Sequence, residues 1–387
     1  MKRFLRRIAC AVLCLCIWNN VSVIVFAEDE TDLKLYARSA ILMDAATGRV
    51  LYEENGYAVM PMASTTKIMT CILALESARL EEYVTVSANA ARQPKVRLGI
   101  KEGESYLLKD LLYSLMLESH NDTAVAIAEF IGGDVESFAD MMNDKALELG
   151  CEDTFFITPN GLDATKDGRQ HSSTACDMAK ITAYALKNDA FREIITTNTY
   201  SFMEKNRTKQ YTVYNKDAFL TMYEGAVGVK TGFTNGAGYC FVGAVEQGDA
   251  CFISVVLASG WPPNKSWKWA DTKTLMNYGT QNFYYTTFCG DYDYGCIRVE
   301  EGIVNEVPLV VMREEIGLLL KENETIEVEY DREEYLTAPV YAGQKVGYER
   351  YVLEGEIIAE FPIITAQKAE RIHFWYCFGK IAEKFFL

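Results

Sequence analysis

The sequence predicts an α+β protein in which helices flank an antiparallel sheet, followed by a small all-β domain and a terminal amphipathic helix. Strand patterns occur near the start of the chain and again after a long helical middle, at residues 39–43, 50–52, 226–230, 238–244 and 252–258. Strands from both ends of a chain can form one sheet that the middle covers. After about residue 294, Glu-rich segments alternate with β patterns and turn signals, which indicates the second domain.

The first element is a cationic and apolar leader. Four cations precede an apolar run at residues 8–26, which only Asn19-Asn20 interrupts: Lys2, Arg3, Arg6 and Arg7. This is the pattern of a signal peptide, and Val25-Phe26-Ala27 is an acceptable cleavage site, so we expect residues 1–27 to direct export and then to be removed. A retained membrane anchor is the alternative, because the run is nearly long enough to span a bilayer.

The following elements are assigned from turn and helix signals. Residues 44–48 join the first two strand patterns, which predicts a hairpin. Helical patterns dominate as far as residues 178–186, with a stop at Gly132-Gly133. The later strand patterns are rich in Val, Ile and aromatic residues, as a half-buried sheet requires.

Three short motifs occur in a fixed order: Ser64-Thr65-Thr66-Lys67, Ser119-His120-Asn121 and Lys230-Thr231-Gly232. Each is weak alone, but together they describe a serine nucleophile with a lysine base. Ser87-Ala88-Asn89 also fits the middle motif, although its position after a strand pattern and before an Ala-rich run is typical of a helix N-cap. We therefore assign the middle motif to Ser119.

The chemistry explains the spacing of the first motif. A serine hydroxyl needs a base within hydrogen-bond reach, and residues three apart share a helix face. Lys67 can accept the Ser64 proton only when it is neutral, so burial and a second cation, for which Lys230 is the candidate, should lower its pKa. A helix start also offers free N–H groups to a developing oxyanion.

The residues around the motifs resemble low-molecular-weight penicillin-binding proteins, the serine-type D-alanyl-D-alanine carboxypeptidases. Four segments carry this resemblance: residues 39–52, 62–70, 119–129 and 228–240. It extends from about Leu35 to Leu387. It implies a β-lactamase/transpeptidase-like catalytic domain at residues 28–290, a small β-rich domain at 291–362 and a membrane-associating helix at 363–387.

The resemblance also implies a role for each motif residue, with peptidoglycan stem peptides as substrates and β-lactam antibiotics as inhibitors. Ser64 would be the acylated nucleophile, Lys67 its base, and Ser119 the proton relay to the leaving D-alanine. The remaining residues would bind the substrate. Asn121 would hold its peptide amide, Lys230 and Thr231 would hold its terminal carboxylate, and Gly232 would let the strand approach it closely. The backbone N–H groups of Phe233 and Ser64 would form the oxyanion hole.

Two positions depart from the family pattern. His120 stands where a small residue is frequent, and we expect an outward-pointing loop side chain there. Phe233 stands where many relatives carry a polar residue. That change would be tolerated if only the backbone N–H matters, although substrate access and the rate of deacylation could both shift.

Other functions fit the sequence less well. A class A β-lactamase needs a glutamate between the second and third motifs, but residues 154–174 contain no Glu, only Asp163 and Asp167. A non-catalytic penicillin sensor would add transmembrane helices and a signalling domain, which the sequence does not indicate. A Ser64-His171-Asp163 triad is disfavoured because triads are recognised by geometry, and we expect His171 and Asp163 to tie down their loop instead.

Composition limits cofactors and partners. A net charge of −16, more negative still without the leader, disfavours nucleic acid. With three histidines and no metal-binding or phosphate-loop motif, we expect no metal and no cofactor. The 11 cysteines, of which Cys10, Cys14 and Cys16 lie in the leader, are too few for a disulfide scaffold, and Cys71 is interpreted as a small core residue.

The last segment, residues 366–387, predicts an amphipathic helix that lies on a membrane surface. Its apolar face would contain Ile372, Trp375, Gly379, Ala382 and Phe386, with Arg371, Lys380 and Lys384 away from it. A helix packed on the β-rich domain has the same period and is the alternative. Together with the leader, this segment predicts a location at the outer face of the cytoplasmic membrane or in the cell wall space.

Overall fold

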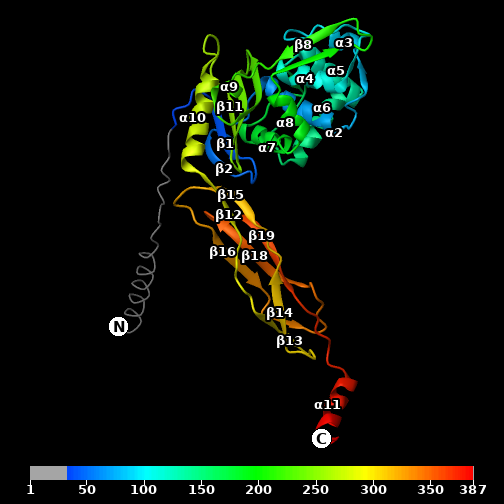
Figure 1. The fold of residues 1–387 in the computed structure, drawn as a ribbon, viewed down its shortest axis with the longest axis vertical. Coiled ribbons are helices and arrows are strands. Elements are labelled where there is room, and N and C mark those ends of the chain that lie inside the picture. The colour runs from blue at the N-terminus through cyan, green and yellow to red at the C-terminus, as the bar shows by residue number, and fades with distance from the viewer. Residues whose placement is uncertain (1–32, 387) are drawn as a thin grey trace, which may run out of the picture. The chain divides into compact units, whose positions relative to one another are not determined.

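The centre of the fold is a five-stranded antiparallel sheet in the order β2-β1-β11-β10-β9, seen in a computed structural model that describes residues 33–386 (Figure 1). Its strands are β1 (Ser39–Asp44), β2 (Val50–Glu54), β9 (Ala226–Thr234), β10 (Gly238–Gln247) and β11 (Ala250–Leu257). The N-terminal hairpin joins the late strands through β1 and β11. The predicted α+β class with an antiparallel sheet is confirmed, whereas the predicted signal peptide lies outside the described residues.

Helices cover both faces of this sheet because side chains along a strand alternate between the faces. Leu42 and Phe252 face Gly279 of α10 (Trp267–Asn282). Ile41 and Ile253 instead join a large core with the other helices. These are α2 (Lys67–Glu76), α4 (Leu108–Leu117), α5 (Asn121–Gly132), α6 (Val135–Glu148), α7 (Ala175–Ala185) and α8 (Asp189–Thr196).

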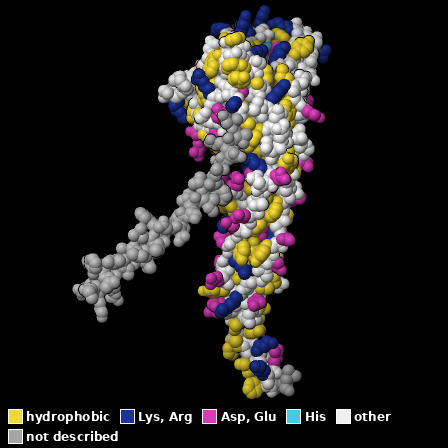
Figure 2. Space-filling view, turned by 90° about the vertical axis from the view of Figure 1, so that its left-hand side faces the viewer, with side chains coloured by type: hydrophobic (Ala, Val, Ile, Leu, Met, Phe, Trp, Pro, Cys, Tyr) yellow, Lys and Arg dark blue, Asp and Glu magenta, His cyan; other side chains and the backbone are white. Residues whose placement is uncertain are grey.

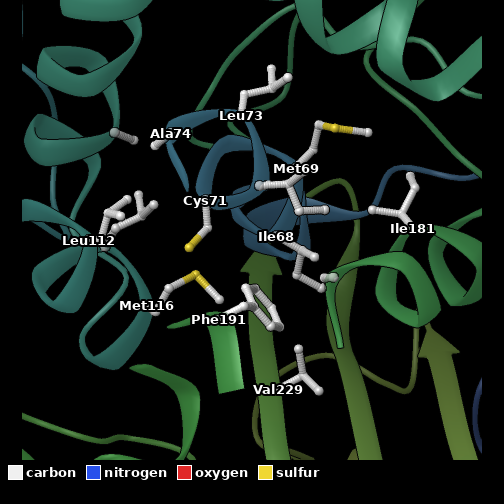
Figure 3. Packing of buried hydrophobic residues seen from close by; sticks show 14 of the residues in the cluster. Ile68, Met69, Cys71, Leu73, Ala74, Leu112, Met116, Ile181, Phe191 and Val229 are labelled. Atoms are coloured by element: carbon white, nitrogen blue, oxygen red, sulfur yellow. The ribbon is translucent and has the colours of Figure 1, made fainter. Parts of the chain in front are cut away.

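The helix that follows the first motif, α2, is almost completely buried. Nine of its ten residues are buried, so it runs through the core and not along its surface. Figure 3 shows Cys71 pointing into the side-chain cluster that includes Met116 and Phe191. This confirms that Cys71 is a core residue, and burial raises the pKa of its thiol.

Short elements connect these larger ones. A 3-10 turn, η1 (Ala63–Thr66), leads into α2. Three small two-stranded antiparallel sheets and two one-turn helices complete this part of the fold: β3 (Tyr83–Thr85) with β4 (Ser105–Leu107), β5 (Thr165–Lys166) with β6 (Arg169–Gln170), β7 (Thr199–Met203) with β8 (Gln210–Tyr214), α3 (Ala88–Ala91) and α9 (Phe219–Met222).

A second β-rich region follows α10. Its six-stranded sheet has the order β16-β18-β19-β14-β13-β17, and β12 pairs with β15 beside it. The bounds are β12 (Tyr284–Phe288), β13 (Cys296–Glu300), β14 (Glu306–Val311), β15 (Ile316–Leu320), β16 (Glu327–Arg332), β17 (Tyr335–Thr337), β18 (Lys345–Leu353) and β19 (Glu356–Thr365). β12 starts before residue 291 and β19 ends after residue 362, so the β structure extends beyond the range of 291–362 that the family resemblance implies.

A partly buried ion pair joins the first domain to the second β-rich region. Arg49, in the β1–β2 turn, donates to both oxygens of Glu324 at 2.9 and 2.5 Å and to the carbonyl of Leu319 at 2.6 Å. A bidentate pair of this kind fixes orientation as well as distance.

The chain ends in α11 (Phe374–Phe386), whose apolar side chains are solvent-exposed. Phe374, Trp375, Phe378, Ile381 and Phe385 are between 56 and 82% exposed, so they do not pack on the β-rich sheet. The apolar face is wider than predicted. Ile372, which we predicted to belong to the apolar face, lies before the first residue of the helix. Its N–H donates to the carbonyl of Glu301. No helix among residues 33–386 has the length and apolar character of a membrane span.

Candidate active site

Ser64 and Lys67 meet at the junction of η1 and α2. Ala63 has a φ of +49°, and the hydroxyl of Thr66 donates to the Ala63 carbonyl at 2.8 Å, so a tight turn precedes the helix. This turn places Ser64 Oγ 2.9 Å from Lys67 Nζ. The spacing of three residues therefore brings the Ser64 and Lys67 side chains together, as expected.

Lys67 is fully buried, and its surroundings favour the neutral amine. Its pKa is well below the ordinary value because burial disfavours the charged form and because Lys230 lies nearby, while Asp122 opposes the shift. Nζ donates to Asn121 Oδ1 at 3.0 Å and to the carbonyl of Asn160 at 2.5 Å. A charged amine would donate its third hydrogen to Ser64 Oγ, whereas a neutral amine has only two hydrogens; when both bond to Asn121 and Asn160, its lone pair can accept the Ser64 proton.

The second motif forms the turn between α4 and α5. Ser119 has a φ of +65°, and its half-buried hydroxyl forms no hydrogen bond within residues 33–386. Asn121 is the first residue of α5 and contacts Lys67 directly. The turn thus holds the Ser119 hydroxyl, which has no hydrogen-bond partner, two residues before the Asn121 amide that binds Lys67.

His120 does not point outward, so our expectation for this side chain was wrong. It is 4% exposed, with Nδ1 2.8 Å from Ser114 Oγ of α4 and Nε2 3.3 Å from a carboxylate oxygen of Glu118. The short turn folds the ring back onto the end of α4. Burial lowers the pKa of His120, although Asp122 and Glu118 oppose the shift. The ring therefore braces the turn that carries Ser119.

The third motif lies on β9, directly against the turn at Ala63 and Ser64, which we call the nucleophile turn. A Cβ on Gly232 would lie 2.9 Å from the backbone nitrogen of Ser64 and 3.1 Å from Ala63 Cβ, so only glycine permits this approach. Thr231 is half-buried, and Phe233 is exposed with its ring 4.6 Å from that of Tyr239. The strand thus brings the Ser64 N–H beside the third motif.

Lys230 lies buried in this strand among other charges. Its pKa is lowered to about 7, chiefly because burial disfavours the charged form; Asp217 opposes this shift and Lys268 adds to it. Its Nζ donates to the carbonyl of Thr231 at 3.0 Å. Sequence patterns did not reveal Lys268 or Asp217, because α10 and the segment before α9 reach Lys230 only through tertiary packing.

Residues 154–174 stand out in the sequence for their lack of glutamate, but no sequence pattern places the Asn160 carbonyl in the site. The carbonyl of Asn160 accepts from Lys67 and from Ser64 Oγ, the latter at 3.3 Å. Gly161 has a φ of +81°, and its Cα faces the carbonyl of Ala63. A carbonyl belongs to every residue type, so only the preceding Pro159 and following Gly161 hinted at a special loop.

His171 and Asp163 fix this loop and form no triad with Ser64. His171 Nε2 lies 2.8 Å from Thr66 Oγ1, and its Nδ1 accepts the Ile157 N–H at 2.9 Å. Burial lowers the pKa of His171 to about 3. Asp163 accepts the hydroxyl of Thr234 at 2.7 Å. The prediction that both residues tie down the loop is confirmed.

Metal-binding and disulfide chemistry are not evident in the described part of the chain. Residues 33–386 contain no group of three or more His, Cys, Asp or Glu side chains that could hold a metal ion. All eight cysteines of this range are free, and five of them are partly or fully buried. The site therefore consists of hydroxyl, amine, amide and backbone groups.

Comparisons with known proteins agree with this geometry. A family model described as D-alanyl-D-alanine carboxypeptidase matches residues 25–260. A second model, the C-terminal domain of penicillin-binding protein 5, matches residues 284–371. The D-alanyl-D-alanine carboxypeptidase DacF of Bacillus subtilis is 29% identical, covering 97% of this chain and 96% of its own. DacC of Escherichia coli is 32% identical, with coverages of 89% and 86%.

Solved structures show the same similarity. Penicillin-binding protein 5 of Haemophilus influenzae matches with a TM-score of 0.72 and 26% identity, covering 87% of this chain and 98% of its own. Penicillin-binding protein D2 of Listeria monocytogenes, in an ampicillin-bound form, matches with a TM-score of 0.57 and 30% identity, covering 64% and 99%.

Proposed function

Because the chain belongs to the D-alanyl-D-alanine carboxypeptidase family, we propose that Ser64 cleaves the bond between the two terminal D-alanines of peptidoglycan stem peptides. The chain is a serine-type carboxypeptidase, and its relatives bind β-lactams as well. The observation that carries the assignment of roles is the fully buried Lys67, 2.9 Å from Ser64 Oγ with both of its remaining hydrogens engaged.

In the first step Lys67 takes the proton of Ser64 while Oγ attacks the penultimate carbonyl. The N–H groups of Ser64 and Phe233 stabilise the oxyanion. Asn121 holds the peptide amide upstream of the scissile bond, and Lys230 with Thr231 holds the terminal carboxylate. Ser119 then passes the proton to the departing D-alanine nitrogen, so the C–N bond breaks and an acyl-enzyme remains.

Water hydrolyses this acyl-enzyme in the second step and frees Ser64. A β-lactam acylates the same serine, but we expect its slow release because the loop offers Ser64 the Asn160 carbonyl and no glutamate. A carbonyl cannot take a proton from the attacking water as a carboxylate can. This observation favours a carboxypeptidase over a β-lactamase.

The activity can be tested with two peptides that differ in one stereocentre. We expect release of D-alanine from a peptide ending in D-Ala-D-Ala and none from one ending in L-Ala-D-Ala. Mass spectrometry should place a persistent penicilloyl group on the fragment that contains Ser64. Labelling without D-alanine release would instead identify a sensor, and rapid loss of label with accumulating penicilloate would identify a β-lactamase.

We also propose that the enzyme is exported and works at the outer face of the cytoplasmic membrane, with α11 on the membrane surface. The leader pattern supports export. The exposed aromatic side chains of α11, together with Lys380 and Lys384, support binding to an anionic lipid surface.

Vesicles that contain anionic lipid should bind the protein through α11. We expect Trp375→Ser with Phe378→Ser to weaken vesicle binding at least about tenfold, because each removes a large apolar side chain from the bilayer. Tyr376→Ser, on the other side of the same helix, is the control and should bind nearly as the unchanged protein does. Equal cosedimentation of all three proteins would disprove the role of this face.

A further inference from the structure

One border of the active site carries unpaired positive charge. We call Arg92, Lys95 and Arg97 the basic rim; all three are exposed. Within residues 33–386 none of their side chains forms a hydrogen bond or an ion pair. These three cations lie within a stretch of six residues, in a protein whose net charge is −16. Figure 2 shows Lys and Arg side chains gathered at its top, the end where Figure 1 labels α3, α5 and β8.

Hydrogen bonds tie the basic rim to the catalytic groups. The carbonyl of Val96 accepts from the backbone N–H of Asn121 at 2.7 Å, and the carbonyl of Pro94 accepts from its side-chain amide at 3.3 Å. Gln93 accepts from the amide of Asn160 at 3.2 Å. Asn121 and Asn160 both bind Lys67, so a single residue connects the rim segment to the proposed base.

The carboxylate that binds the end of the rim segment is already engaged. Asp122 is fully buried, and its oxygens accept the N–H groups of Leu98, Gly99 and Ile100 at 2.9, 2.8 and 3.3 Å. These bonds anchor the end of the rim segment to the start of α5. They also leave the rim cations without an internal counter-ion, so an external anion would meet them in a fixed arrangement.

We propose that the basic rim is a subsite for a free carboxylate that the substrate peptide carries upstream of its D-Ala-D-Ala end. This inference rests on the proposed function. The terminal carboxylate is assigned to Lys230 on β9, and Asn121 to the upstream amide, so the rest of the peptide leaves the cleft on the Asn121 side. The rim borders that side, and Arg and Lys recognise carboxylates.

The test compares two peptides that end in D-Ala-D-Ala and differ only in an upstream γ-linked glutamate, whose α-carboxyl is free in one and amidated in the other. We expect kcat/KM for the free acid to be about fivefold to tenfold higher at low ionic strength, because exposed charge pairs are individually weak. Added salt should remove this preference.

Arg92→Gln with Lys95→Gln and Arg97→Gln should also remove the preference, while activity on the amidated peptide is retained. The control removes the same charge elsewhere, through Lys187→Gln, Arg298→Gln and Lys368→Gln, and should keep the preference. Equal rates for both peptides in the unchanged enzyme, or a preference that survives in the rim variant, would overturn the proposal.

Two further outcomes are distinct from these. A rim variant that loses activity equally on both peptides would show that the cations support the cleft and do not select charge. Inhibition by polyphosphate that the rim variant relieves equally for both peptides would point to a phosphate polymer instead, and would also overturn the proposal. If neither peptide releases D-alanine, the proposed function itself fails.

Discussion

Replacing Lys67 by methionine is expected to suppress acylation of Ser64 as strongly as Ser64→Ala does. Methionine fills the space of the lysine stem but cannot accept a proton, and the nearest alternative partner of Ser64 Oγ is the Asn160 carbonyl at 3.3 Å. Loss of a general base typically lowers rates by about 10²- to 10⁴-fold. The second-order rate of labelling by a fluorescent penicillin measures the change, with Lys187→Gln as an exposed control.

The same variant has a characteristic effect on stability. The pKa of Lys67 is lower in the folded protein than the ordinary 10.5, so the unfolded chain binds the proton more readily. The contribution of Lys67 to stability should therefore rise with pH up to about 10.5, and Lys67→Met removes this contribution, whereas Lys230, whose pKa is also lowered, keeps its own. We expect the variant to melt no lower than the unchanged protein at neutral pH. A lower melting temperature would mean that lost labelling reflects damage to the fold.

The pH profile of the unchanged enzyme should report the same lysine. Acylation falls when the pH drops through the lowered pKa of Lys67, because the protonated amine has no lone pair for Ser64. A labelling rate that rises on acidification, or a methionine variant that still labels readily, would require a different base.

Local pattern was sufficient to predict which residues of the three motifs lie together in the candidate site. Three-residue spacing on a helix brought Ser64 and Lys67 together, and strand alternation placed Lys230 and Gly232 on one face of β9. The antiparallel sheet followed from strand patterns at both ends of the chain. In each case the informative contact lies within one element or follows from its period.

Tertiary packing decided what the sequence did not indicate. His120 is buried because its turn folds onto Ser114, and the charge of Lys268 acts on Lys230 because α10 packs against β10 and β11 of the same sheet. Neither depends on a local pattern. The Asn160 carbonyl is a backbone group, and its role depends on how closely its loop approaches the nucleophile turn.

That approach depends on Gly161, and Gly161→Ala should disable the site. Its φ of +81° disfavours any side chain, and a Cβ would lie 2.0 Å from the Ala63 carbonyl oxygen and 2.9 Å from the Ser64 nitrogen. Both contacts are with backbone, so no rotamer relieves them. The loop must move away and carry the Asn160 carbonyl from Lys67. A displacement of about 1 Å can lower a rate about 10²-fold, and we expect at least that loss of penicillin labelling.

Gly168→Ala is the control for Gly161→Ala, because it introduces the same backbone strain without the steric clash. Gly168 has a φ of +78°, nearly that of Gly161, but a Cβ there meets no atom within 4 Å. It should lose only about 1–2 kcal/mol of unfolding free energy and keep full labelling. Gly161→Ala should lose more stability than this control, together with its labelling, when both are measured by denaturant unfolding and by labelling kinetics. If the two variants lose equal stability and label alike, the loop tolerates the methyl group, and close contact between Asn160 and the nucleophile turn is not required for acylation.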